Sequence, residues 1–241
     1  MEELLVELTN EEKIELKKFG ILPQKQEGYY VVRFLSNVGY FSANDMITLS
    51  NIANKYGRGE LSLTSRLTVE IPYIKEEFIQ NVIDIIKSNN LRTGGSGKTV
   101  RAVLSCKGSV CRRSIVDIRS ISDKIEKKFF GKPLPGKFKI GVFGCVNSYG
   151  KAQTNDLSIM PMKTLKSEEA EYLIFLGGSI GRKPRLGSTM KTRFKEDELL
   201  DVIDAVLTFY KNNANEKERF SRVIERLGME KAEEEILNIL R

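Results

Sequence analysis

Histidine is absent from this sequence of 241 residues, and so is tryptophan. The lack of histidine excludes Ser-His-Asp and Cys-His nucleophiles, histidine-ligated zinc and a haem held by an axial histidine. Any acid–base chemistry therefore falls to lysine, arginine, tyrosine, cysteine or carboxylate side chains. Cysteine is scarce as well, and three cysteines cannot all pair with one another. In a chain that we expect to be cytoplasmic, metal or redox chemistry is a better first hypothesis than disulfide bonds.

Long apolar runs are also missing, and none approaches the roughly 18 residues that a membrane span needs. The acidic start, Met1-Glu2-Glu3, lacks an apolar signal core, so we expect a cytoplasmic protein without membrane association. The net charge of +7 indicates an anionic partner. Nucleic acid ranks last among such partners, because no known binding motif is present and aromatic residues are not interleaved with the basic ones.

Periodicity and chain breaks predict an N-terminal segment and two domains. Residues 1–27 are expected to form a helix that ends near Gly20, followed by a linker. Residues 28–95 alternate strand, helix, strand and helix, and the alternation of apolar and polar side chains predicts one strand over 61–71. The glycine-rich stretch 93–99 fails the spacing of a phosphate-binding P-loop, so we interpret it as a boundary. Residues 96–241 then form the second domain, whose expected elements are strands at 100–105, 137–143, 156–162 and 171–177, a helix at about 112–130, and two or three helices from 195 onward.

The cysteines are the candidate metal ligands. Cys106 and Cys111 lie in a loop around a glycine, and Cys145 follows the strand predicted at 137–143. Thiolates from two loops are typical of iron–sulfur sites, but cysteines are also common as buried apolar residues, and the spacing leaves both readings open. A four-ligand site would need Tyr149, Asp156 or an exogenous ligand as its fourth member.

Basic residues accompany the cysteines. Lys137 and Lys139 share the strand face whose parity continues to Cys145, and Arg101 stands just before Cys106. Arg66 lies on the polar face of the strand predicted at 61–71. Cations beside a redox centre would hold a small oxyanion or a polycarboxylate cofactor, whereas the alternative is ordinary solvated surface. A second basic loop, Gly177–Gly187, contains Arg182, Lys183 and Arg185, and we interpret it as a solvated turn.

Several segments, in order, resemble the sulfite and nitrite reductase family, whose members use sirohaem coupled to a four-iron cluster. The resembling segments are Leu63–Arg66, Val100–Cys106, Leu134–Lys139, Gly144–Ser148, Gly177–Gly178 and Glu218–Phe220. The resemblance spans residues 28 to 230 and identifies a small, single-unit member. It implies an α+β fold, with a ferredoxin-like half domain followed by an α/β domain of the sirohaem and 4Fe-4S type.

The resemblance also implies roles for individual residues. Arg101, Lys137 and Lys139 match the residues that contact the bound oxyanion and supply charge and protons. Arg66 matches a residue that holds sirohaem carboxylates, and Arg33 is expected to assist it. The remaining assignments are Cys106, Cys111 and Cys145 as ligands of a 4Fe-4S cluster, and Asn147 and Tyr149 as cofactor-binding residues.

Two departures from the family pattern matter. The first cysteine pair is one residue closer than in the family, and Tyr149 stands where the family has its fourth cysteine, which bridges the cluster and the sirohaem. The resemblance implies an oxidoreductase that passes electrons from a donor protein through a cluster and sirohaem to sulfite or nitrite. The alternative is a non-catalytic relative that holds a cluster or tetrapyrrole for transfer or sensing. A homodimer could supply the second half that larger members contain; a monomeric mass by light scattering with cofactor present would exclude it.

Overall fold

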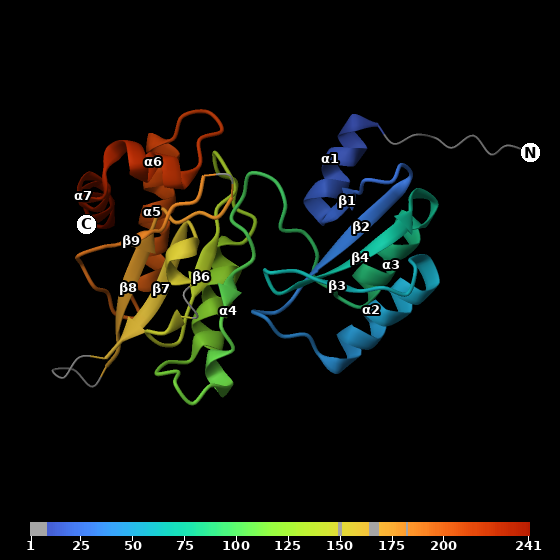
Figure 1. The fold of residues 1–241 in the computed structure, drawn as a ribbon, viewed down its shortest axis with the longest axis horizontal. Helices are drawn as coiled ribbons and strands as arrows, with labels where there is room; N and C mark the ends of the chain where they lie inside the picture. The colour runs from blue at the N-terminus through green and yellow to red at the C-terminus, as the bar shows by residue number, and fades with distance from the viewer. Residues whose placement is uncertain (1–8, 149–150, 164–168, 182) are drawn as a thin grey trace, which may run out of the picture. The chain divides into compact units, whose positions relative to one another are not determined.

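The computed structural model describes residues 9–148, 151–163, 169–181 and 183–241 (Figure 1). The chain divides into two compact units, Met1–Gly97 and Lys98–Arg241. Within the described residues, no helix combines the length and the apolar character needed to cross a membrane. The mixed α and β content confirms the expected fold class, and each unit has a hydrophobic core of its own.

The first unit is an antiparallel sheet covered by helices. Its strands are ordered β1-β2-β4-β3, and apolar residues at alternate positions of β2 and β4 pack against the second and third helices. The elements are α1 (Asn10–Phe19), β1 (Ile21–Pro23), β2 (Tyr29–Leu35), α2 (Ala43–Tyr56), β3 (Ser62–Leu63), β4 (Thr68–Lys75) and α3 (Ile79–Ser88). The segment expected to be a plain linker thus contributes strand β1, and Gly20 ends α1 in a left-handed conformation, as predicted.

The prediction of one strand over 61–71 is wrong, because the chain turns back on itself there. Strands β3 and β4 pair antiparallel through a turn in which the Thr64 and Thr68 hydroxyls lie 2.6 Å apart and Leu67 takes a positive φ of 59°. Leu63, expected on the buried face, is therefore 79% exposed. Arg66 lies in this turn rather than on a strand face. The alternation corresponds to burial only after the turn, where Val69 and Ile71 are buried, and the turn itself contains no glycine or proline that would have indicated it.

The second unit is a five-stranded sheet in the order β5-β6-β7-β8-β9. The pairs β5–β6 and β6–β7 are parallel, and the remaining pairs are antiparallel. The strands are β5 (Leu104–Ser105), β6 (Ile140–Val142), β7 (Leu157–Met162), β8 (Glu171–Leu176) and β9 (Ser188–Thr189). The helices are α4 (Ile118–Phe129), α5 (Leu199–Asn213), α6 (Phe220–Leu227) and α7 (Met229–Leu240), which gives three helices after residue 195.

The two faces of the second sheet differ in what covers them. Alternate residues such as Ile140, Val142 and Ile159 join the main core with all four helices of this unit. The intervening residues face the other side, where Phe143, Met160 and Phe175 form a small cluster. Because side chains alternate across a strand, this second face is the one to which Lys137 and Lys139 belong by parity.

Candidate functional site

Parallel strand pairing brings the cysteines to one edge of the second sheet. Cys106 follows β5 directly, and Cys145 lies three residues beyond the end of β6. Leu104 pairs with Gly141 and Ser105 with Val142, so the carboxyl ends of both strands meet at the same edge. The pairing continues past the strands, since the Cys106 N–H donates to the Val142 carbonyl at 3.3 Å. Two cysteines that are far apart in the sequence are thereby brought to the same edge by the sheet.

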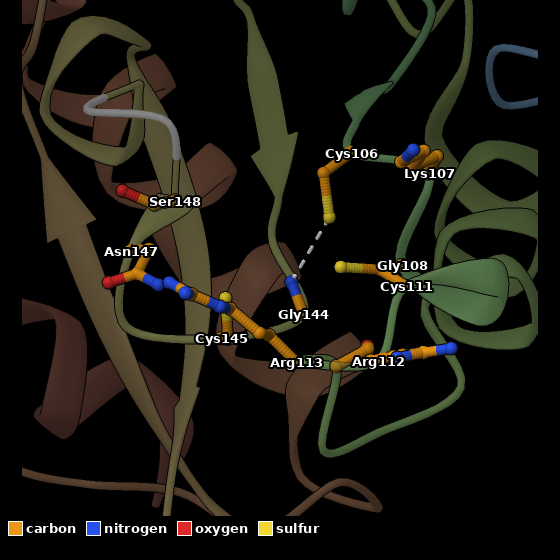
Figure 2. Close-up of a pocket in the computed structure, with 11 residues that line it drawn as sticks. Cys106, Lys107, Gly108, Cys111, Arg112, Arg113, Gly144, Cys145, Asn147 and Ser148 are labelled. Atoms are coloured by element: carbon orange, nitrogen blue, oxygen red, sulfur yellow. Dashed lines mark hydrogen bonds between the residues drawn. The ribbon is translucent and has the colours of Figure 1, made fainter.

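All three cysteines line one pocket with a volume of about 500 Å³ (Figure 2). In the close-up, the sulfur atoms of Cys106 and Cys111 point into the space beside Gly144. The Gly144 N–H donates to the Cys106 Sγ at 3.4 Å, so the two cysteine loops are joined by a hydrogen bond inside the pocket. The three cysteines are free thiols and half-buried, which fits ligands better than it fits core residues.

Two glycines allow the cysteine loops to pack on the start of helix α4. A Cβ at Gly108 would lie 2.6 Å from Ile118 Cγ1 and 2.7 Å from its Cβ, and a Cβ at Gly144 would clash with the Ser114 side chain and lie 3.0 Å from Ile118 Cγ1. These separations are too short for real side chains. Ile118 therefore holds both cysteine loops at once, and only glycine fits at either contact.

Helix α4 begins at Ile118, later than expected, because the preceding residues form the wall of the pocket. Gly108–Val110 make a short 3₁₀ turn, and the Cys111 N–H donates to the Gly108 carbonyl at 2.8 Å. Asp117 caps the helix and accepts a hydrogen bond of 2.9 Å from the Ser109 hydroxyl inside the cysteine loop. That hydrogen bond is the main cause of the lowered pKa of Asp117. A charged cap thus ties the loop of Cys106 and Cys111 to the helix.

The three cysteine thiols of the pocket are the donors that could hold an iron–sulfur cluster. Within the described ranges, no three Cys, Asp or Glu side chains converge as ligands of a single metal ion. A cluster of several irons distributes its thiolates over separate corners, so its ligands need not converge on one point. Three thiols around one cavity suit that arrangement, and we take Cys106, Cys111 and Cys145 as the residues that would hold a cluster. Asn147 also lines the pocket, whereas Tyr149 lies outside the described residues.

The three predicted oxyanion ligands come together on neighbouring backbone segments. Val100 and Phe138 form a parallel bridge and both enter the main core. The Arg101 N–H donates to the Phe138 carbonyl at 2.8 Å, between Lys137 and Lys139. Lys137 and Lys139 flank Phe138, so alternation directs them to the opposite face of the sheet. That face carries the cluster of Phe143, Met160 and Phe175, against which Cys106 packs.

The backbone of Lys139 is bound by a buried ion pair between Asp156 and Arg219, which the sequence did not predict as part of the site. Asp156 has a fully buried side chain, and it accepts hydrogen bonds from Arg219 at 3.1 and 3.2 Å and from the Lys139 N–H at 2.9 Å. The Lys139 carbonyl accepts from the Leu157 N–H at 3.1 Å. Both backbone groups of Lys139 are therefore held. Asp156 does not line the cysteine pocket, so it is not placed as a fourth cluster ligand.

The remaining predicted residues are found elsewhere. Arg33 and Arg66 belong to the first unit, and Arg33 forms an ion pair of 2.7 Å with its cross-strand partner Glu70. In the basic loop, Arg185 donates to the Gly177 carbonyl at 2.8 Å and so braces its own turn. Arg182 lies outside the described residues. The roles predicted for Arg33 and Arg66 stay predictions.

Comparison with known proteins decides the family. Residues 96–240 match the nitrite and sulphite reductase 4Fe-4S domain, and residues 22–89 match the nitrite/sulfite reductase ferredoxin-like half domain. The chain belongs to the nitrite and sulphite reductase family. The matched ranges confirm the expectation of a ferredoxin-like half domain followed by a 4Fe-4S domain.

Relatives in this family include long and short proteins. The chain is 24% identical to the coenzyme F420-dependent sulfite reductase of Methanocaldococcus jannaschii, over 92% of this chain and 44% of that one. It is 24% identical to the assimilatory-type sulfite reductase of Nitratidesulfovibrio vulgaris, over 90% and 97%. The fold is similar to that of the Mycobacterium tuberculosis NirA protein, with a TM-score of 0.83 and 19% identity, over 96% of this chain and 48% of that one. The chain thus spans about half the length of some relatives and nearly all of another.

We expect the Asp156–Arg219 pair to be essential for stability. Replacement of Arg219 by Met leaves a buried carboxylate without its counter-charge, which should lower the free energy of unfolding by about 3 to 5 kcal/mol. Arg222→Met is the matched control, because Arg222 forms an exposed ion pair with Glu225 on the same helix, and it should cost less than about 1 kcal/mol. Denaturant unfolding measures both, and equal effects would contradict the prediction.

The stability that Arg219→Met loses should depend on pH. Burial raises the pKa of Asp156 above its ordinary value of 3.8, while Arg219 opposes the rise. Without Arg219 the pKa rises further, so the folded state binds the proton more tightly than the unfolded state. Stability then falls as pH increases from the ordinary pKa through the raised one. The free energy of unfolding of Arg219→Met, relative to that of the native protein, should therefore be larger at about pH 5 than at about pH 8. Adding Asp156→Asn to Arg219→Met should remove this pH dependence.

Proposed function

We propose that this protein is an oxidoreductase that reduces a small oxyanion, sulfite or nitrite. The observation that carries the proposal is the placement of Arg101, Lys137 and Lys139 around one backbone bridge, in the same domain as the cysteine pocket. The three cysteines would hold a cluster that, with a bound sirohaem, would pass electrons from a donor protein to the oxyanion. The names of the relatives, which include sulfite reductases and ferredoxin–nitrite reductases, support the same reaction class.

The chain's own residues provide binding, charge and protons. The guanidinium of Arg101 and the two ammonium groups present only hydrogen-bond donors, which suit an oxyanion with several acceptor oxygens. Charge accumulates on that oxyanion as electrons arrive, and cations fixed in advance stabilise it without reorganisation. Because the chain has no histidine, the lysine ammonium groups are the natural source of protons. Arg66 and Arg33 are proposed to hold sirohaem carboxylates.

Replacement of Lys137 or Lys139 by Met should reduce the turnover of sulfite or nitrite by about 100-fold or more, because each variant removes a preorganised cation. The rate is measured in anaerobically purified protein with reduced methyl viologen as donor. Lys211→Met is the control, because Lys211 is an exposed residue of α5 with the same charge. Its turnover should match that of the native protein.

A non-catalytic protein that carries a cluster or tetrapyrrole is the second candidate. The supply of only three cysteines favours it, because the bridging fourth cysteine of the family is missing. Protein that binds iron, sulfide and sirohaem but turns over neither oxyanion would support this candidate and contradict the reductase.

The electron donor is proposed to be an acidic protein. Lys107, Arg112 and Arg113 line the cysteine pocket, and no carboxylate is found among its described lining residues. Turnover with an acidic ferredoxin should therefore fall steeply as ionic strength rises, since salt screens the attraction. Turnover with the cationic donor methyl viologen should not fall with salt. A ferredoxin-driven rate that is insensitive to salt would contradict this partner.

A further inference from the structure

The cysteine pocket provides fewer ligands than a four-iron cluster has irons. The whole sequence contains three cysteines and no histidine, and all three cysteines line this pocket. A cubane cluster offers one coordination position on each of about four irons. Three of these positions can be filled by Cys106, Cys111 and Cys145. The ligand of the remaining iron is therefore a group other than cysteine or histidine, or it comes from outside the chain.

Oxygen donors in the described part of the chain are poorly placed for this task. No aspartate or glutamate is among the described lining residues. Asp156, the nearby carboxylate in the sequence, is fully buried and bound by Arg219 and by the Lys139 N–H. Figure 2 shows the side chains of Asn147 and Ser148 on the far side of the pocket from the sulfurs of Cys106 and Cys111. The described lining residues therefore supply no carboxylate for a fourth iron.

The charges around the cavity determine what kind of ligand would enter it. Three cationic side chains line it, from Lys107, Arg112 and Arg113. In Figure 2 the two arginines extend in opposite directions, and Arg113 extends toward the side where Cys145 and Asn147 lie. A guanidinium in this position stabilises an anion through charge-assisted hydrogen bonds. The cavity of about 500 Å³ is also larger than a cluster ligand of one or two atoms requires.

We propose that the cluster of this protein has one iron without a protein ligand, and that this iron binds a small exogenous anion held by Arg113. The proposal rests on the cluster binding proposed above. It adds an expectation that cluster binding alone does not give. One iron should exchange its ligand and should be removable, while the three thiolate-bound irons stay in place.

Selective loss of iron tests the open position. Protein reconstituted anaerobically with iron and sulfide, without tetrapyrrole, is treated with ferricyanide. One electron passes to ferricyanide and one Fe²⁺ leaves, so two ferric and two ferrous ions become three ferric ions in the remaining cluster. Iron content should fall from about four to about three per chain, with the electron paramagnetic resonance signal of a three-iron cluster. Added Fe²⁺ and a reductant should restore the original state.

Two variants of residue 149 distinguish an open iron from a tyrosinate-bound one. Tyr149→Phe should leave the iron loss and the absorption spectrum unchanged, and Tyr149→Cys should make the cluster resist ferricyanide, because a fourth thiolate is supplied. If Tyr149→Phe removes a visible absorption band or accelerates iron loss, tyrosine is the ligand and the proposal is wrong. Retention of all the iron in the native protein would also overturn it.

Cyanide is the anionic probe of the open iron. It should alter the resonance spectrum of the reduced cluster in native protein, and Arg113→Gln should weaken its binding by about tenfold. Lys211→Gln, which removes the same charge from a distant helix, should not weaken it. A spectrum that cyanide leaves unchanged would overturn the proposal. Failure to incorporate iron and sulfide at all would overturn the proposed function too, whereas a stable, unreactive four-iron cluster would overturn only the open iron.

Discussion

The parallel pairing of β5 with β6 is the interaction on which the cysteine pocket depends. It aligns the carboxyl ends of two strands that are separated by more than thirty residues, and so it brings Cys106 and Cys145 to one edge of the sheet. A separate parallel bridge between Val100 and Phe138, one residue out of the β5–β6 register, sets Arg101 beside Lys137 and Lys139. The parallel pairing of these two segments therefore places both the cysteines and the backbone of the three basic residues.

Contacts at the start of helix α4 fix the two cysteine loops that follow strands β5 and β6. Gly108 and Gly144 come from the two cysteine loops; a Cβ at Gly108 would clash with Ile118, and a Cβ at Gly144 would clash with Ser114 and lie 3.0 Å from Ile118 Cγ1. Asp117, one residue earlier, caps the helix and binds Ser109 of the first loop. The loops that line the pocket are thus held by one helix end and by two glycine contacts. This explains why the helix begins later than its apolar periodicity predicts, since the residues before Ile118 are needed for the wall.

The two faces of the second sheet have different roles: one forms the main hydrophobic core, and the other carries the residues of the candidate site. One face packs against four helices and forms the main core. The other carries a small apolar cluster that touches Cys106, with the two lysines on the same strand face. Asp156, which directly precedes β7, pairs with Arg219 and accepts a hydrogen bond from the Lys139 N–H. Three hydrogen bonds offset the cost of burying this carboxylate in part, and burial still raises its pKa. The pair therefore acts by holding the Lys139 backbone rather than as a ligand.

Local patterns in the sequence determined the elements, and only the tertiary structure decided which of them meet. The strand, helix, strand and helix order of residues 28–95 and the end of the first helix at Gly20 follow from short-range periodicity and chain breaks, and both are found. The three cysteines and the family motifs predicted the cluster ligands; the structure brings these cysteines to one pocket, and their role as ligands stays a prediction. The turn at Thr64–Leu67 could not be read, because hydroxyl hydrogen bonds and one positive φ replace the usual glycine or proline. The ion pair of Asp156 and Arg219 joins residues 63 positions apart, and such a contact depends on how the chain folds back, which no local pattern records.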